Sequence, residues 1–312
     1  MNVVSALKWF HNWVGFFISI TMLIVLTTGV YLGGADMLKR LDDKGQQYSP
    51  LSVERKAEVT TTLFERYPDI STVRFPTEHT PYIQAGARGT TIALDSELNE
   101  LSVSKFSESP VYSTVFWLHR NFLLKDFGKY LNAWASLIGA AITLVGIYLL
   151  WRVRKGFGLK QSLPKDTRSS SLLKSHIQLG LFISVPLFVL CLSGFLITYK
   201  SLWVGALKQP AAEISYPVSQ ASNWQSQLQT AQDLWPESNL VAVSKPRVKK
   251  GETPTELNYS INFDSHNDVW LREADRMTMS FEQGIIKNAL KHSDRTLSGQ
   301  VASFVRPLHD AL

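Results

Sequence analysis

The chain has very little cysteine: Cys191 is the single one among 312 residues. One cysteine excludes an intramolecular disulfide and a cysteine-ligated zinc or iron–sulfur centre built within one chain. The sequence also lacks a P-loop and a G-x-G-x-x-G in a strand–turn–helix context. The net charge of +6 is not gathered in one basic domain, so we expect no nucleic-acid partner.

Charged side chains are absent from three long apolar runs, Val14–Gly34, Ala133–Trp151 and Ile177–Tyr199. A helix crosses a bilayer with about 20 apolar residues, so we predict three transmembrane helices in contact with membrane lipid. The first run is longer than the apolar part of a signal peptide and no A-x-A site follows it, so we expect it to be retained. A secondary transporter is disfavoured, because ion pathways normally need an ionisable group inside the membrane.

The first and third apolar runs resemble each other in sequence. KWFHNWVGFFISITMLIVLTTGVYLGG (8–34) returns in edited form as KSHIQLGLFISVPLFVLCLSGFLITYK (174–200). One offset without gaps aligns His11 with His176 and Gly29 with Gly194. Unrelated apolar helices share leucine and isoleucine by chance, but not histidine and glycine in register. We interpret the chain as two tandem copies of one membrane unit.

The loop between the second and third runs is strongly basic. It holds one acid, Asp166, against seven basic residues, which are Arg152, Arg154, Lys155, Lys160, Lys165, Arg168 and Lys174. Short basic loops stay in the cytoplasm, so we predict a cytoplasmic N-terminus and two segments on the far side. In a bacterium this is an inner-membrane protein whose outer segments lie in the periplasm.

Both outer segments have the pattern of a helix followed by short strands. In the first we predict a helix at Leu51–Tyr67 and strands at Ser71–Phe75, Tyr82–Gly86 and Thr90–Leu94. In the second we predict a helix at Trp224–Leu234 and strands at Leu240–Ser244, Leu257–Phe263 and Val269–Arg272. The fold class is then an α-helical membrane protein with three spans and two small α+β modules. The predicted order is helix 1–35, outer module 36–131, helix 132–152, basic loop 153–175, helix 176–200 and outer module 201–312.

Several short motifs occur in a characteristic order. They are LHR at Leu118–Arg120, PLH at Pro307–His309, an HxxxG opening on the first and third runs, and Thr-Gly or Ser-Gly near the ends of those runs. Together they resemble the PepSY-associated transmembrane family over nearly the whole chain. The resemblance implies paired membrane helices, PepSY-like periplasmic modules, and in some members haem-dependent reduction of siderophore-bound ferric iron. The family pattern adds a fourth span after the second outer histidine, whereas this chain ends at Leu312.

Four of the seven histidines fall on the repeat. His11 and His176 begin the first and third runs, and His119 and His309 stand at matching places outside. The resemblance implies b-type haem with paired histidines as axial ligands, His11 with His176 and His119 with His309. Hydrogen bonding to lipid headgroups is the alternative for each of the four. The other three, His79, His266 and His292, are interpreted as surface residues.

Two arginines and three glycines accompany these histidines. Arg120 and Arg306 adjoin the outer pair, where they would bind haem propionates or lipid phosphates. Gly29, Gly146 and Gly194 lie near span ends and are interpreted as sites of close helix packing. His309 is three residues from Leu312, and chain ends fray. We therefore expect a firmly held haem at His11 and His176 and a weaker one at the outer pair.

Two functions follow as expectations. The first is electron transfer through haem to a ferric siderophore in the periplasm, from a quinol or a reductase. The alternative is a non-catalytic membrane-anchored PepSY module that binds or regulates a peptidase or another envelope protein. The absorption spectrum separates them, because only the first predicts a red protein.

Overall fold

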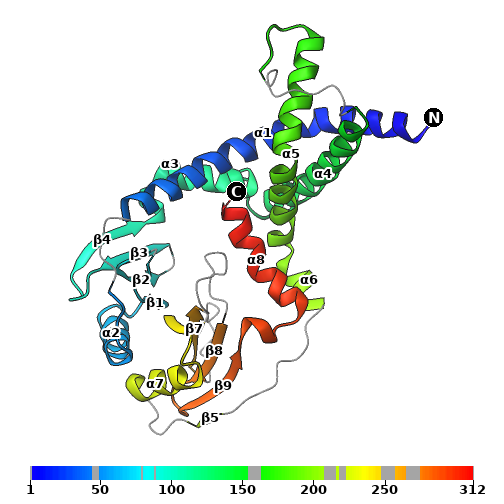
Figure 1. Cartoon of the computed structure of the whole chain (residues 1–312). Helices are drawn as coiled ribbons and strands as arrows, with labels where there is room; N and C mark the ends of the chain where they lie inside the picture. Colours follow the sequence, from blue (N-terminus) through cyan, green and yellow to red (C-terminus); the bar gives the residue numbers. More distant parts are fainter. Residues whose placement is uncertain are drawn as a thin grey trace. The chain divides into compact units, whose positions relative to one another are not determined.

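The computed structural model describes residues 2–43, 49–78, 80–87, 89–153, 163–206, 216–217, 223–246, 257–264 and 275–311. The chain divides into two compact units (Figure 1). The helical unit comprises Met1–Gly34, Thr114–Leu202 and Val305–Leu312. The sheet unit comprises Ala35–Ser113 and Trp203–Phe304. Each unit therefore gathers segments from both halves of the sequence.

Three long helices form the framework of the helical unit: α1 (Val3–Asp43), α4 (Lys125–Val153) and α5 (Ser169–Thr198). Each contains a stretch long and apolar enough to cross a membrane, at Val3–Lys39, Lys125–Trp151 and Ser169–Thr198. The prediction of three membrane helices is confirmed. All three begin earlier than their apolar runs, because the polar flanking residues continue the helical hydrogen bonding. His11 and His176 consequently lie inside helices rather than before them.

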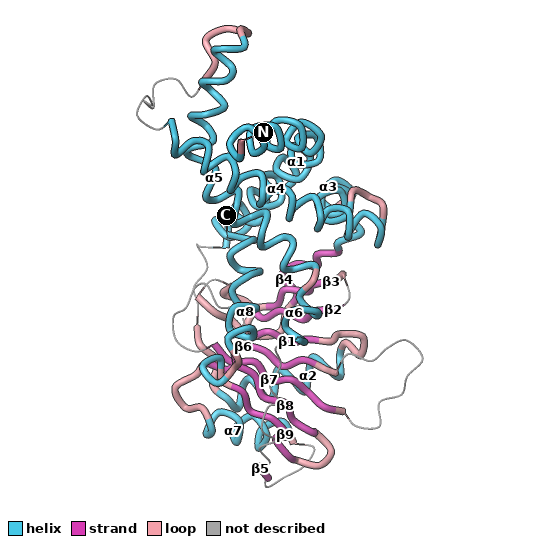
Figure 2. The backbone as a smooth tube through the Cα atoms, turned by 90° about the vertical axis from the view of Figure 1, so that its right-hand side faces the viewer, coloured by secondary structure: helices cyan, strands magenta, loops and turns pink. Residues whose placement is uncertain are grey.

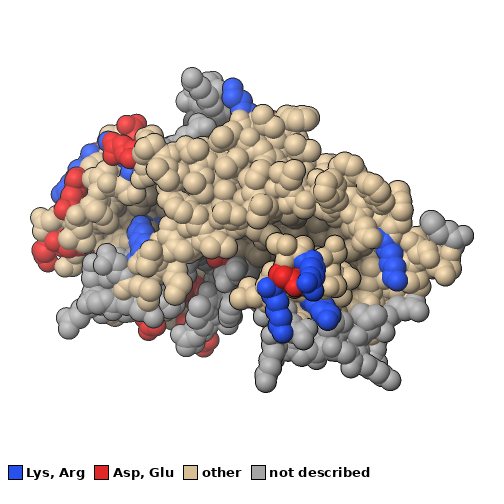
Figure 3. Space-filling model, turned by 90° about the horizontal axis from the view of Figure 1, so that it is seen from above, with Lys and Arg blue, Asp and Glu red and all other residues tan. Residues whose placement is uncertain are grey.

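The surface of these helices is largely apolar. On α1 the side chains of Phe16, Phe17, Ile20 and Val30 are each more than two-thirds exposed. The face shown in Figure 3 is a broad uncharged area, with Lys, Arg, Asp and Glu confined to its margins. An exposed apolar belt of this size is what lipid contact requires.

Small residues let the long helices approach closely. Helices α4 and α5 pack against each other, and Trp134 of α4 stacks edge-on against Phe195 at a ring-centroid distance of 5.9 Å. A Cβ atom at Gly139 of α4 would lie 2.9 Å from the Met22 sulfur and 3.2 Å from the Cys191 sulfur. Side chains of α1 and α5 thus both rest on one glycine of α4, as is common between membrane helices.

Three shorter helices were not predicted: α3 (Pro110–Asn121), α6 (Lys200–Ala206) and α8 (Leu297–Ala311). Helix α3 opens on Pro110, a residue suited to the first helical position because its missing N–H needs no partner there. Helix α8 opens after Thr296, whose Oγ1 accepts a hydrogen bond from the Gly299 N–H at 3.3 Å. Helices α3 and α8 carry His119 and His309, so they matter for the site.

The sheet unit contains one nine-stranded antiparallel sheet (Figure 2). Its strand order is β4-β3-β2-β1-β6-β7-β8-β9-β5. The segment between α1 and α3 supplies β1 (Thr72–Arg74), β2 (Ile83–Ala87), β3 (Thr90–Leu94) and β4 (Glu100–Lys105). The segment between α6 and α8 supplies β5 (Tyr216–Pro217), β6 (Asn239–Ser244), β7 (Asn258–Asp264), β8 (Asp275–Ser280) and β9 (Ile285–Leu290).

The two segments share this sheet through one central pairing, between β1 and β6. Strands β1 and β6 run antiparallel, with Val73 opposite Val243 and Thr72 opposite Ser244. Each segment contributes a helix and a four-stranded meander, which is the pattern of a repeat, and β5 extends one edge. Five predicted strands are confirmed within one or two residues at each end. Strands β4, β5, β8 and β9 were missed, and the predicted strand Val269–Arg272 lies outside the described residues.

Helices α2 (Val53–Arg66) and α7 (Trp224–Leu234) pack together and bury their apolar sides against the sheet. Leu63 and Leu228 are fully buried there together with Val73, Ile261 and Phe263 of the strands. Both helices were predicted, because their apolar residues recur at helical spacing.

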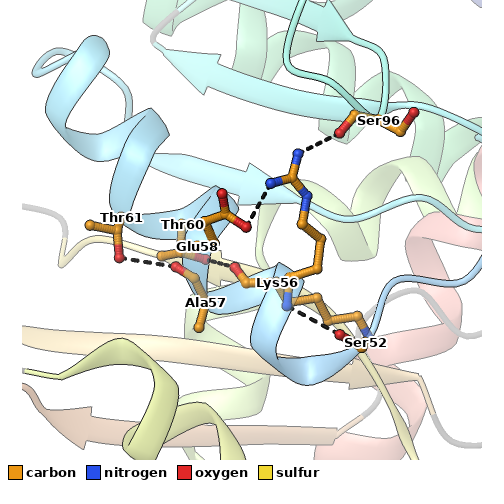
Figure 4. A network of polar contacts seen from close by, with 8 residues as sticks. Ser52, Lys56, Ala57, Glu58, Thr60, Thr61 and Ser96 are labelled. Carbon is orange, nitrogen blue, oxygen red and sulfur yellow. Dashed lines mark hydrogen bonds and ion pairs between the residues drawn. The ribbon is translucent and has the colours of Figure 1, made fainter.

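Both sheet-unit helices begin with a side-chain cap. The Ser52 hydroxyl accepts from the Arg55 N–H at 3.2 Å, and the Asn223 side chain accepts from the Gln225 N–H at 2.9 Å. In the first turn of α2 the Arg55 guanidinium also pairs with Glu58 and donates to the Ser96 carbonyl (Figure 4). These contacts fix the start of α2 against the turn before β4.

Candidate functional site

The structure brings the four repeat-related histidines together in two pairs within the helical unit. The rings of His11 (α1) and His176 (α5) have centroids 6.1 Å apart and an interplanar angle of 58°. The rings of His119 (α3) and His309 (α8) have centroids 6.1 Å apart and an angle of 52°. The two pairs are thus nearly identical in geometry. They are the pairs that the sequence predicts, and their role as ligands stays a prediction.

His11 is held by helix α4. Its Nδ1 lies 3.2 Å from the Ile142 carbonyl oxygen, and since a carbonyl can only accept, Nδ1 carries the proton. A Cβ atom at Gly146 would lie 3.1 Å from Cε1 of the same ring. The absent side chain at residue 146 therefore makes room for the imidazole, and Nε2 is left as the unprotonated nitrogen.

His119 is held by helix α1 in a closely related way. Its Nδ1 lies 3.0 Å from the Val25 carbonyl oxygen and 3.0 Å from the Thr28 hydroxyl. Here too the carbonyl makes Nδ1 the donor. A Cβ atom at Gly29 would lie 3.2 Å from Cε1 of the ring. Thr28 is buried, so this contact is shielded from water.

His309 meets the equivalent residues of α5. Its Nδ1 lies 2.9 Å from the Ser193 hydroxyl. A Cβ atom at Gly194 would lie 3.5 Å from Cε1. The repeat thus extends from the histidines to their surroundings. His309 lies in helix α8 and contacts α5 at both Ser193 and Gly194.

His176 differs from the other three. Its side chain is exposed, and its ring nitrogens have no hydrogen-bond partner within the described part of the chain. Its position is set by α5, where the neighbouring Ser175 and Gln178 are buried. The contact that the structure gives its ring is the one with His11.

A tight corner between α3 and α4 positions His119. Phe122, Leu123 and Lys125 all have φ between 52° and 63°, a left-handed conformation uncommon for residues with a Cβ. A Cβ atom at Gly128 would lie 1.8 Å from the Asn121 carbonyl oxygen, so this position demands glycine.

Asn132 of α4 strengthens the same corner. Its side-chain amide donates to the His119 carbonyl at 2.7 Å and to the Arg120 carbonyl at 3.3 Å. The end of α3 is thus tied to α4 through the backbone of the histidine and its neighbour.

The two arginines do not touch the imidazoles in any contact of the described residues. The Arg120 guanidinium lies over the rings of Phe116 and Trp117, at 6.0 and 5.7 Å from their centroids. The Arg306 Nε lies 3.5 Å from Asp310, and its side chain is 76% exposed. Cation–π contact and an exposed i,i+4 ion pair hold these side chains weakly. Their predicted roles toward propionates or lipid phosphates stay predictions.

The other histidines lie apart from these pairs. His79 and His266 are outside the described residues. His292, expected at the surface, is partly buried in the sheet unit. Its Nδ1 lies 3.3 Å from the Ser303 hydroxyl, its ring packs on Phe304, and its backbone N–H donates to Asp275 at 2.6 Å. These contacts give it a structural role.

The residues that surround the imidazoles were not predicted from the sequence. Thr28 and Ser193 were noticed only as parts of the Thr-Gly and Ser-Gly motifs, and Gly29, Gly146 and Gly194 were interpreted as helix-packing sites. In the structure each of these glycines faces a histidine ring. The usable signal was the repeat itself, because it aligns Thr28-Gly29 with Ser193-Gly194.

Among the described residues, no group of three or more His, Cys, Asp or Glu side chains could hold a metal ion. A two-histidine site is therefore what this part of the chain offers, and the remaining ligands of any metal would come from a bound group. A model of the PepSY-associated TM region matches residues 8–312, so the chain belongs to this family. No curated protein matches the chain.

Proposed function

We propose that this member of the PepSY-associated TM region family binds haem at each histidine pair and carries electrons across the membrane to siderophore-bound ferric iron. The observation that carries the proposal is the existence of two matching imidazole pairs in one bundle of membrane helices. Along α1, His11 and the Thr28 contact of the second pair are 17 residues apart, or about 26 Å. That separation approaches the roughly 30 Å hydrocarbon core of a bilayer.

The residues present fit a bis-histidine haem. Two imidazoles that share one metal ion each place a nitrogen about 2 Å from it, which puts their ring centroids about 6 Å apart. Both pairs have this spacing. His11 and His119 donate through Nδ1 to carbonyl oxygens, which leaves Nε2 with a free lone pair. An acceptor on the second nitrogen is the usual surrounding of a metal-binding histidine.

Haem held by two histidines would supply one-electron transfer without an open position for a ligand. The chain would provide the rest. His11 with His176 and His119 with His309 would fix the two sites, and the apolar helices would keep water away from them. Ferrous iron binds hard oxygen ligands more weakly than ferric iron, so one electron delivered to the substrate would release the metal from its siderophore.

The direction of transfer follows from the basic loop. With this loop in the cytoplasm, electrons would enter at the His11–His176 site and leave at the His119–His309 site in the periplasm of a bacterium. The donor would be a quinol or a reductase.

The absorption spectrum of the purified full chain tests the proposal. We expect a red protein with a Soret band, and a pyridine haemochrome assay then counts haem per chain. His11→Ala and His176→Ala should each remove the same haem, and the double variant should resemble either single one. His79→Ala serves as the matched control with unchanged haem. Full haem content in both single variants would contradict the pairing.

A colourless protein would support the alternative function, a membrane-anchored PepSY module that binds or regulates a peptidase or another envelope protein. Its binding surface would then lie on the sheet unit, and no histidine substitution in the helical unit should affect partner binding.

A further inference from the structure

The second histidine pair is surrounded by two hydroxyl groups that the repeat places at matching positions. Thr28 precedes Gly29 on α1 and contacts His119, and Ser193 precedes Gly194 on α5 and contacts His309. Both hydroxyl-bearing residues are at least nine-tenths buried. In both repeats, the hydroxyl of a residue that precedes a glycine thus contacts Nδ1 of a histidine.

The direction of these hydrogen bonds follows from counting protons. A hydroxyl has one proton to donate. The Thr28 hydroxyl lies 2.6 Å from the Ile24 carbonyl oxygen, and the Ser193 hydroxyl lies 3.0 Å from the Leu190 carbonyl oxygen. Each hydroxyl therefore donates its proton to a carbonyl of its own helix, as buried helical hydroxyls do. Each is left with lone pairs toward the imidazole, so Nδ1–H of the histidine donates to the hydroxyl.

The first pair lacks this arrangement. His11 has a carbonyl acceptor from Ile142, and His176 has no acceptor among the described residues. A hydroxyl acceptor is thus specific to the second pair. The Nδ1–H group of His119 has two acceptors, the Val25 carbonyl and the Thr28 hydroxyl.

We propose that Thr28 and Ser193 are positioning residues that set the ring orientation and the electron-donating strength of His119 and His309. The inference rests on the proposed function, since it concerns the iron that this pair would hold. An acceptor on Nδ1–H fixes the tautomer and makes the opposite nitrogen a stronger ligand. Stronger donation favours oxidised iron, so the two hydroxyls hold the second site harder to reduce than it would be without them.

The test compares the full-chain wild type with Thr28→Val, Ser193→Ala and the double variant. Potentiometric titration of the two haems and electron paramagnetic resonance of the oxidised protein are the readouts. We expect one of the two redox components to become easier to reduce, by roughly 3- to 10-fold in its equilibrium constant, while the other stays unchanged. The resonance of the same component should shift, because each substitution removes one of the contacts that fix the ring orientation.

Matched controls are available one residue away from Thr28 and nine residues away from Ser193. Thr27→Val makes the same chemical change at an exposed neighbour of Thr28, and Ser184→Ala removes a hydroxyl from the same helix as Ser193. Both should leave the titration unchanged. Thr28→Ser and Ser193→Thr exchange the residues of the two repeats and should restore the wild-type potential.

The outcomes separate this inference from the function on which it rests. A colourless wild type overturns both. A wild type and variants that all hold two haems, with the same potentials and resonances, overturn the positioning role alone. If Thr28→Val loses haem at this site, Thr28→Ser decides: a retained haem with the wild-type potential supports the role of the hydroxyl, and its loss contradicts it.

Discussion

Gly146 lies directly against the imidazole of His11. A Cβ atom at residue 146 would come within 3.1 Å of Cε1 and 3.7 Å of Nδ1, the nitrogen that donates to Ile142. Gly29 and Gly194 stand in the same relation to His119 and His309. Three histidines of the two pairs are thus placed by the absence of a side chain on a neighbouring helix.

Gly146→Ala should displace the His11 ring and weaken its bond to the Ile142 carbonyl. If His11 is a haem ligand, we expect haem at this pair to be lost roughly 10-fold more readily, because the ring can no longer keep its orientation. Haem transfer to excess apomyoglobin measures the loss rate. Gly180→Ala, where a Cβ would meet nothing within 4 Å, is the control. Equal loss rates in the two variants would show that residue 146 does not position the ligand.

Gly128→Ala should destabilise the corner between α3 and α4. The added methyl would overlap the Asn121 carbonyl oxygen, which is backbone and cannot move without shifting α3. We expect a loss of about 3 kcal/mol in unfolding free energy, together with a weakened His119–His309 site. Thermal unfolding of the full chain in detergent is the measurement. Gly33→Ala, in open space on α1, should be neutral or slightly stabilising. A wild-type melting temperature for Gly128→Ala would contradict the structure of this corner.

Lys56 makes the stability of the protein depend on pH. Burial lowers the pKa of its ammonium group to about 8, well below its usual range. Between that value and about 10.5 the unfolded chain holds more protons than the folded one, so stability rises with pH in this window. Below pH 8 the full cost of the buried charge is present.

Lys56→Met should therefore raise the unfolding free energy at pH 7 by roughly 1–3 kcal/mol, with the gain disappearing as the pH approaches 10. Phe75, whose ring lies 5.8 Å from Nζ, offsets part of the cost through cation–π contact. Melting curves of the full chain between pH 7 and 10 measure the effect. Lys105→Met, at an exposed lysine paired with Glu108, should show no such pH dependence. A constant difference between Lys56→Met and wild type over this range would be inconsistent with a buried charge.

The orientation in the membrane can be tested with Thr90→Cys and Lys160→Cys. The natural Cys191 is 6% exposed within α5, so the background should remain unlabelled. A membrane-impermeant thiol reagent added to whole cells should label residue 90 and not residue 160. The reverse pattern would invert the orientation and exchange the faces assigned to the two histidine pairs.

The membrane helices and the histidine pairs could be predicted from the sequence. Apolar length fixes a span, because a helix must bury about 20 residues in lipid whatever surrounds it. The gap-free alignment of His11 with His176 indicated that the two histidines occupy equivalent positions in a two-fold repeat. Equivalent residues of such a repeat can meet at its two-fold axis. The helices α2 and α7 were readable for a similar local reason, since their apolar spacing has the period of a helix.

How the two repeats join, and which residues hold each imidazole, could be learned only from the three-dimensional structure. Local pattern says which residues form a strand, but the pairing of β1 with β6 depends on residues 170 positions apart, Val73 and Val243. Strand β4 is exposed along its whole length, so it had no alternating apolar signal to detect. Thr28 and Ser193 looked like ordinary hydroxyls at the end of a span. They accept hydrogen bonds from His119 and His309 because α3 and α8 pack beside them in the folded protein. A hydrogen bond depends on the distance between two groups, and a sequence pattern does not give that distance.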